Sequence, residues 1–183
     1  MTPEQQHAVV ELVRGRISSA QFVERTGLDP GARPEIIESE LRAALVSRDA
    51  HTVESALTLA SRFGVLTAGL GPLLAELLLL PWHQQHEDIA RALQQLRLPT
   101  TVDALATAAL VKHDYLAYND SHAFARKCTW ALADIGTREA RAHLERLARS
   151  SDSEIAAYAQ KRLDKWDAEL HRKGTAARPE TIR

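Results

Sequence analysis

Apolar residues recur along most of this chain at every third or fourth position, which is the spacing of an amphipathic helix. The strict alternation of apolar and polar residues that a half-buried strand requires is absent. The pattern therefore predicts an all-α fold. The expected helices span residues 3–15, 34–48, 52–62, 66–80, 86–97, 124–135, 138–149 and 153–167, with one more after Ser18 or Ser19 and another from Thr100 or Thr101 to Lys112.

One block of this pattern occurs twice, 39 positions apart. The repeated positions are Ala92, Leu93, Leu96, Leu105 and Ala109 in the first copy and Ala131, Leu132, Ile135, Leu144 and Ala148 in the second. Each copy reads as two helices, and the short joint Gly136-Thr137 makes the second pair antiparallel. A period of roughly 35 to 45 residues is typical of a solenoid, whose helix pairs bury their apolar faces against their neighbours. The repeat predicts an α-solenoid over residues 34–170.

The two ends of the chain depart from this repeat. Residues 1–33 contain short helices and a loop rich in glycine and proline, and we expect them to cap the end of the solenoid. Residues 171–183 have no apolar period and are expected to form a disordered tail. The sequence therefore predicts three regions: a helical cap, the solenoid and the tail.

Charge and cysteine content narrow the class of partner and the compartment. The chain carries 23 Lys and Arg against 24 Asp and Glu, so it lacks the basic footprint expected of a protein that binds nucleic acid. The single cysteine, Cys128, excludes an internal disulfide, and the N-terminus has no signal-peptide pattern, which favours the cytoplasm. The longest apolar run, residues 70–82, is shorter than the roughly 20 residues of a membrane span. Neither nucleic acid nor a membrane is an expected partner.

The most irregular segment lies at residues 112–122, where a regular solenoid would turn within a few residues. It contains two tyrosines, two aspartates, an asparagine and two histidines. These residues suit a protein contact patch, but they equally suit a structured turn in which Asn and Asp bond to the backbone. Trp82 follows Pro81 at a joint between helices and is expected to be the most exposed tryptophan, whereas Trp130 and Trp166 are expected in the core. The candidate partner-binding residues are Trp82, His83, Asp114, Tyr115, Tyr118, Asn119, Asp120 and His122.

Two further groups of side chains are of the types that catalyse reactions or bind metals. One cluster of possible metal ligands precedes a predicted helix: His83, His86, Glu87 and Asp88. It lacks the His-Glu-x-x-His spacing, and carboxylates are favoured at a helix N-terminus in any case. The adjacent pair Ser121-His122 has no nucleophile elbow around it, and no phosphate-binding glycine loop is present. We therefore expect no catalytic residue, no metal and no cofactor, and the chain is not expected to be an enzyme.

The repeat blocks resemble HEAT repeats of the short bacterial kind. The resemblance rests on Ala92–Leu96 followed by Pro99–Leu105, and on Ala131–Gly136 followed by Ala140–Leu144. It implies a right-handed α-solenoid of antiparallel helix pairs. Asp134 stands where that family often carries Lys or Arg, so the resemblance implies no particular ladder between repeats.

Residues 82–88, 115–118 and 126–136 look like segments of small HEAT-containing bacterial proteins encoded beside polymorphic toxins, several of which are regarded as immunity proteins. The implied function is to neutralise a cognate bacterial toxin domain by tight association. An acidic loop suits a target with a cationic groove. Two alternatives stay open: a scaffold or adaptor of a housekeeping complex, and a HEAT-like nucleic-acid enzyme similar to alkylpurine glycosylases. The second needs a basic face, but the arginines of residues 138–149 are interspersed with Glu139 and Glu145.

Overall fold

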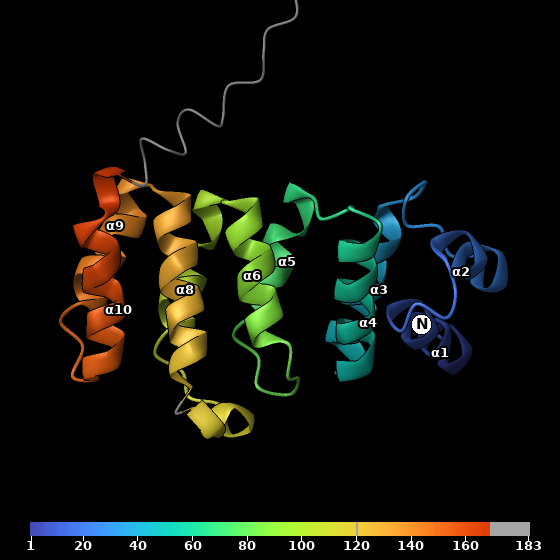
Figure 1. The fold of residues 1–183 in the computed structure, drawn as a ribbon, viewed down its shortest axis with the longest axis horizontal. Coiled ribbons are helices and arrows are strands. Elements are labelled where there is room, and N and C mark those ends of the chain that lie inside the picture. Colours follow the sequence, from blue (N-terminus) through green and yellow to red (C-terminus); the bar gives the residue numbers. More distant parts are fainter. Residues whose placement is uncertain (120, 169–183) are drawn as a thin grey trace, which may run out of the picture. The chain divides into compact units, whose positions relative to one another are not determined.

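The computed structural model describes residues 1–119 and 121–168, and for Tyr118 and Asn119 it describes the backbone only. Every regular element within these residues is a helix (Figure 1), which confirms the prediction of an all-α fold. The chain divides into two compact units, Met1–Ala92 and Leu93–Arg183. The boundary falls inside the predicted solenoid, and the predicted tail, residues 171–183, lies outside the described residues.

The first unit begins with helices whose starts are encoded locally. Thr2 and Ser18 each accept a hydrogen bond from the backbone three residues ahead, and Gln5 and Gln21 return a bond to the capping residue. These capping boxes satisfy backbone groups that a helix end leaves open. The helices are α1 (Pro3–Val13), α2 (Ser19–Thr26), α3 (Glu35–Ser47), α4 (Ala50–Arg62), the 3₁₀ helix η1 (Ala68–Leu70), α5 (Gly71–Leu77) and α6 (His86–Leu96), which crosses into the second unit.

The core of the first unit forms where α1 packs on α2 and α4, and α3 packs on α4 and α5. Its fully buried side chains are Phe22, Ile37, Leu41, Val53, Leu59, Leu74 and Leu77. The expected helix over residues 66–80 is wrong in length, because Pro72 has no N–H to continue a helix and instead occupies the first turn of α5. The apolar run is therefore a 3₁₀ turn followed by a seven-residue helix.

The second unit contains the 3₁₀ helix η2 (Pro99–Thr101), α7 (Val102–Ala108), the 3₁₀ helix η3 (Asp114–Asn119), α8 (His122–Ile135), α9 (Arg138–Leu147) and α10 (Ser153–Asp164). Helix α8 packs on α7, α9 and α10, and α9 also packs on α7 and α10. Its core includes the repeated leucines: Leu93, Leu105, Leu132 and Leu144 are all fully buried. The apolar repeat read from the sequence therefore coincides with packed positions.

Two hydrogen bonds join residues 40 positions apart in the second unit. Gln94 donates to Asp134 at 2.7 Å, between α6 and α8, and His143 bonds to Asp103 at 2.8 Å, between α9 and α7. Because the apolar repeat has nearly the same offset, each bond links a helix to its counterpart one copy later. The side chain of Asp103 is almost fully exposed, so the second bond is weak in water.

Helix α7 differs from the expectation at both ends. Thr101 does not cap it with its side chain, since the hydroxyl donates to the carbonyl of Leu98 at 2.8 Å. The helix ends at Ala108 and does not reach Lys112, because Leu110 and Val111 bond to carbonyls only three residues back. This early end leaves a longer connection to α8 than the sequence predicts.

Candidate functional site

The connection between α7 and α8 is built on buried anchors. The side chains of Leu116 and Ser121 are 4 % and 5 % exposed. The Ser121 hydroxyl accepts from the N–H of His113 and donates to its carbonyl, both at 3.3 Å, and so closes the ends of the connection. Ser121 adopts a left-handed φ of 60°, which turns the chain into α8. The segment predicted as a loop therefore contains a 3₁₀ helix beyond the N-terminal end of α8 (Figure 1). We call the two bonds between Ser121 and His113 the Ser121 clasp.

His113 packs its ring inside this clasp. The ring lies edge-on to Phe124 with centroids 5.4 Å apart and is tilted against Tyr115 at 5.7 Å. Burial lowers the pKa of His113, and the neighbouring Asp114 carboxylate opposes the shift. The packing thus favours a neutral imidazole, and the connection is ordered by aromatic contacts as well as by the Ser121 clasp.

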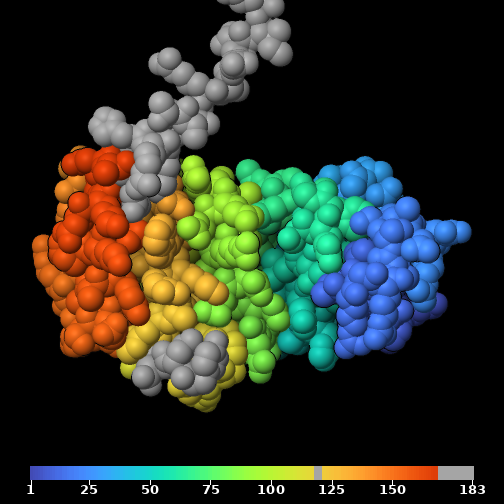
Figure 2. Space-filling model, viewed as in Figure 1, coloured from blue at the N-terminus to red at the C-terminus, as the bar shows by residue number. Residues whose placement is uncertain are grey.

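The outer surface of the connection is partly apolar and partly acidic. Leu110 is 57 % exposed and Val111 is 39 % exposed. Asp114 is exposed and Tyr115 is half-buried. We call these four residues the loop patch; the segment that carries them is yellow-green to yellow in Figure 2 and reaches the surface of the second unit. Adjacent exposed apolar side chains next to a tyrosine are typical of surfaces that contact other proteins.

The charge of Lys112 is balanced within the second unit. Its ammonium lies 3.6 Å from the Asp152 carboxylate, which also bonds to the Nε2 of His122 at 3.2 Å. The other carboxylate oxygen caps α10 by accepting the N–H groups of Glu154 and Ile155. The hydrogen bond from His122 is the main cause that lowers the pKa of Asp152. His122, a predicted partner contact, is therefore engaged in tying α8 to α10.

The predicted site residues are divided between the two units. Trp82 and His83 belong to the first unit, whereas Asp114, Tyr115 and His122 belong to the second. Three further candidates, Tyr118, Asn119 and Asp120, lie outside the described side chains. The loop patch therefore contains two of the eight predicted residues, Asp114 and Tyr115. Its other two residues, Leu110 and Val111, were missed, although two adjacent apolar residues at the end of a helix could have indicated an exposed contact.

The expectation that His83 contacts a partner conflicts with its burial. Its side chain is 1 % exposed. The Nε2 bonds to the carbonyl of Leu77 at 2.8 Å, and the Nδ1 accepts the N–H of Gln85 at 3.1 Å. Its ring stacks on His86 at 4.3 Å and meets Trp82 edge-on at 5.0 Å. His83 and His86 therefore hold the segment between α5 and α6 in place. This agrees with the interpretation of the cluster as the start of a helix.

Trp130 is the exposed tryptophan, which corrects the assignment of this residue to the core. It is 40 % exposed, whereas Trp166 is 7 % exposed and Trp82 is half-buried. The guanidinium of Arg162 lies 3.8 Å from the Trp130 ring centroid and is itself buried. Cys128 is buried. An aromatic ring held by a cation and open to solvent is a second candidate contact surface.

Within residues 1–119 and 121–168, no group of three His, Cys, Asp or Glu side chains is arranged to hold a metal ion. In the same residues no helix combines the length and apolar character needed to cross a bilayer. On α9, Arg141 pairs with Glu145 at 3.2 Å and Arg146 bonds to His143, so these arginines are engaged in local contacts. No protein-family model, curated protein or solved structure matches the chain.

Proposed function

We propose that this chain is a protein-binding immunity protein that neutralises a cognate bacterial toxin domain by tight association, and that the loop patch is its central contact. The observation that carries the proposal is the ordered presentation of this patch. Leu110 and Val111 are exposed beside Asp114, while Leu116 and the Ser121 clasp hold the backbone beneath them. A preformed patch loses little conformational entropy when a partner binds.

The scaffold we propose for this patch is a right-handed solenoid of HEAT-like helix pairs. Support comes from the apolar repeat, whose leucines are buried in the second unit, and from the two hydrogen bonds between residues 40 positions apart. Such scaffolds bind partners through loops on one edge and need no chemistry of their own. The compartment we propose is the bacterial cytoplasm, where the toxin would act.

The binding free energy that the patch alone can supply is too small for tight association, so the patch must be a hot spot within a larger interface. Fully burying a Leu or Val side chain contributes ~1.5–3 kcal/mol, so burial of the remaining exposed area of Leu110 and Val111 contributes about 1 kcal/mol each by the same scale. Nanomolar affinity corresponds to about −12 kcal/mol. The patch therefore needs the surrounding contacts of a standard interface, roughly 800 Å² on each partner.

The charge of the patch suggests the chemistry of the partner. Asp114 is exposed, while the nearby cation Lys112 is already balanced by Asp152. The patch thus presents a net negative charge, which is complementary to the cationic groove of a toxin that binds nucleic acid or another anion. Rim charges of this kind act mainly on the rate of association and on its salt dependence.

The test uses the purified chain as bait for proteins from its own source. Under the proposal, one partner with a toxin-like domain is retained at nanomolar strength, the isolated toxin domain arrests growth of a host cell, and co-expression of the chain restores growth. Leu110→Ser and Asp114→Arg should each weaken protection. Matched controls are Val46→Ser and Glu24→Arg, which change exposed residues of the first unit. Full protection by both patch variants would remove the patch from the interface, and the absence of any toxin domain among the partners would overturn the function.

A scaffold or adaptor of a housekeeping complex is the second candidate. The observation that favours it is the exposed ring of Trp130, because a chain with two separate contact surfaces can join two partners. The same capture separates the candidates. Recovery of a stable assembly of several proteins, with loss of one component on Trp130→Ala and of another on Leu110→Ser, would establish the adaptor in place of the inhibitor.

A further inference from the structure

An open groove of about 490 Å³ lies between α1 and α4 in the first unit. Both helices line it with residues three and four positions apart, so each presents a single face to it. Helix α1 contributes Val10 and Val13, Arg14 directly after α1 also lines the groove, and α4 contributes Glu54 and Thr58. The groove belongs to the first unit, whereas the loop patch and Trp130 belong to the second.

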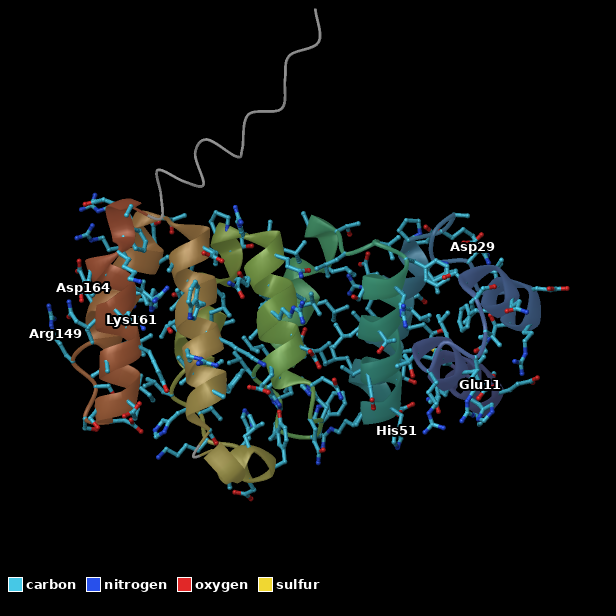
Figure 3. All side chains as sticks on the ribbon, in the orientation of Figure 1. Glu11, Asp29, His51, Arg149, Lys161 and Asp164 are labelled. Carbon is cyan, nitrogen blue, oxygen red and sulfur yellow. The ribbon has the colours of Figure 1, made fainter. Side chains whose placement is uncertain are left out.

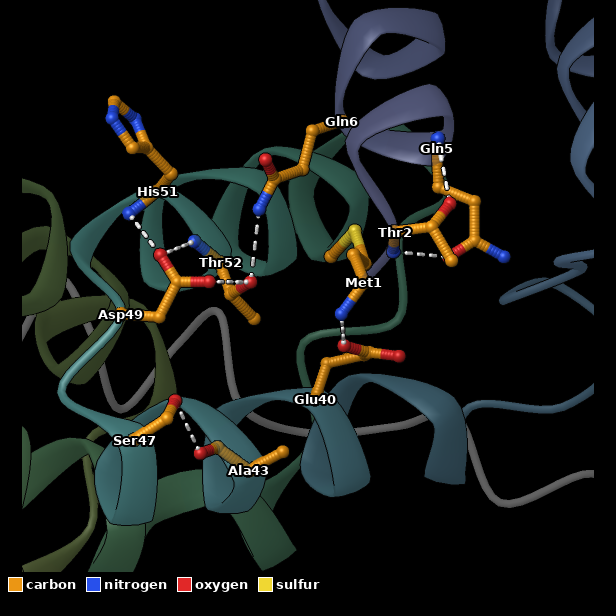
Figure 4. Close-up of polar contacts among 10 residues, drawn as sticks. All are labelled: Met1, Thr2, Gln5, Gln6, Glu40, Ala43, Ser47, Asp49, His51 and Thr52. Atoms are coloured by element: carbon orange, nitrogen blue, oxygen red, sulfur yellow. Dashed lines mark hydrogen bonds and ion pairs between the residues drawn. The ribbon is translucent and has the colours of Figure 1, made fainter.

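Hydrogen bonds at both ends fix the shape of the groove. At one end, Gln6 of α1 donates to the Thr52 hydroxyl at 3.1 Å, and that hydroxyl donates to Asp49 at 2.7 Å (Figure 4). At the other end, Arg62 of α4 donates to the carbonyl of Val13 at 3.2 Å. The two helices therefore run in the same direction, and the groove is preformed.

The α1 side of the groove is partly apolar and open to solvent. Val10 is 43 % exposed and Val13 is 51 % exposed, one helical turn apart on α1. Val9 and Leu12 of the same helix are buried, with 4 % exposed each, and Val9 also lines the groove. The exposed valines are thus additional to the residues that hold α1 on the unit, and they leave apolar area for a partner.

Side chains of opposite charge lie at opposite ends of the groove. Glu54 lies two residues beyond Thr52, near the end that His51 also marks on α4 (Figure 3). Arg14 directly follows Val13, near Arg62. The helix between Glu54 and Arg62 spans about 12 Å at 1.5 Å per residue, which is far beyond ion-pair distance. Both side chains are exposed, and neither is paired with the other.

We propose that this groove is the interface of a homodimer, with a second copy of the chain docked antiparallel on the first. An isologous interface requires a patch that is complementary to itself under a two-fold rotation. Reversing the direction of the groove brings Arg14 of each copy to Glu54 of the other, and it sets the exposed valines of each copy against the α4 side of the partner's groove. A second copy satisfies both charges at once, whereas a peptide or ligand would have to supply two opposite charges at that spacing. The proposal uses only the first unit and is independent of the toxin-binding function.

Sedimentation equilibrium of the full chain tests the proposal at protein concentrations from micromolar to millimolar. The wild type should show a monomer–dimer equilibrium. Arg14→Glu replaces two attractive pairs by two repulsive ones, and an exposed pair is worth roughly a factor of two to five in an equilibrium constant, so the dimer should weaken about tenfold or more. Glu54→Arg should have the same effect, and the double variant Arg14→Glu/Glu54→Arg should dimerise nearly as well as the wild type.

The matched controls are Arg42→Glu and Glu38→Arg on α3, where the two side chains form an exposed pair at 2.7 Å within one helix. These variants make the same charge reversals outside the groove and should dimerise like the wild type. Circular dichroism spectra of all variants verify that the fold is retained. A chain that stays monomeric at millimolar concentration overturns the proposal and leaves the groove to a different occupant. A dimer in which the double variant is as weak as the single variants overturns the pairing of Arg14 with Glu54.

Discussion

Removal of the Asp152 carboxylate should destabilise the second unit, because this group does three things at once. It caps α10 by accepting two backbone N–H groups at 3.1 and 3.3 Å, it bonds to His122 at 3.2 Å, and it lies 3.6 Å from Lys112. Loss of an N-cap residue costs about 1 kcal/mol. A partly exposed bond to an ionised group adds ~0.5–1 kcal/mol, and the contact with Lys112 adds less than about 0.5 kcal/mol. Asp152→Ala should therefore lower the free energy of unfolding by about 2 kcal/mol.

The variant Asp152→Asn separates these contributions. Asparagine is as good an N-cap as aspartate, so it retains the cap and loses the charge. Its expected loss is about half that of Asp152→Ala, measured by urea unfolding at pH 7 with far-ultraviolet circular dichroism. An equal loss for both variants would mean that the cap contributes nothing. A loss below about 0.5 kcal/mol for Asp152→Ala would refute the reasoning altogether, since that is the lower bound for a cap alone.

The lowered pKa of Asp152 predicts how its contribution to stability changes with pH. The pKa of Asp152 is lower in the folded chain than its usual value of 3.8. The unfolded chain therefore binds the proton more readily, and the stabilisation is fully present above pH 3.8 and is lost as the pH falls through the folded pKa. The difference between the wild type and Asp152→Asn should shrink over that window. A difference that persists at still lower pH would assign the effect to something other than the charge.

Three further outcomes are expected. Trp130→Ala should destabilise the chain by ~1–2 kcal/mol, because a buried guanidinium loses the ring that covers it; Trp130→Phe should lose less, and equal losses in thermal unfolding would contradict the stacking. His83→Ala should cost ~1–3 kcal/mol, since the N–H of Gln85 loses its buried acceptor, whereas the carbonyl of Leu77 keeps its bond from the N–H of Leu80; melting at the wild-type temperature would contradict the structural role of His83. The pKa of His113 is lowered by burial, so the unfolded chain binds the proton first and stability should fall as the pH drops below about 6.5. In His113→Leu this part of the pH dependence should vanish, and its persistence in denaturant titrations would assign it to another group.

The starts of α1 and α2 and the burial of the repeated leucines followed from the sequence, because they depend on residues close along the chain. The capping boxes at Thr2 and Ser18 need only a glutamine three residues later. The repeated leucines at Leu93 and Leu132 are buried because the same helical period places them on the same face. Such features survive in almost any packing of the helices, so the pattern alone is sufficient to locate them.

The exposure of Trp130 and the burial of His83 did not follow from the sequence, because each depends on a contact with another element. Trp130 occupies an apolar position of α8, but the residue against its ring is Arg162, which belongs to α10. His83 bonds to the carbonyl of Leu77 at the end of α5, which also accepts the N–H of Leu80. Periodicity describes one helix at a time and does not identify the side chains that a second element brings against it.

In the connection between α7 and α8, some residues hold the backbone in place and others are exposed. His113, Leu116 and Ser121 hold the backbone through ring packing, burial and the hydroxyl clasp. Asp114, between the first two anchors, is exposed. A 3₁₀ helix has three residues per turn, so His113 and Leu116 lie on the same face and Asp114 points elsewhere. Because anchors and exposed positions occupy different faces, a substitution at Asp114 can change the charge offered to a partner without removing a buried contact. That separation is what an inhibitor needs if its specificity is to change while its fold is retained.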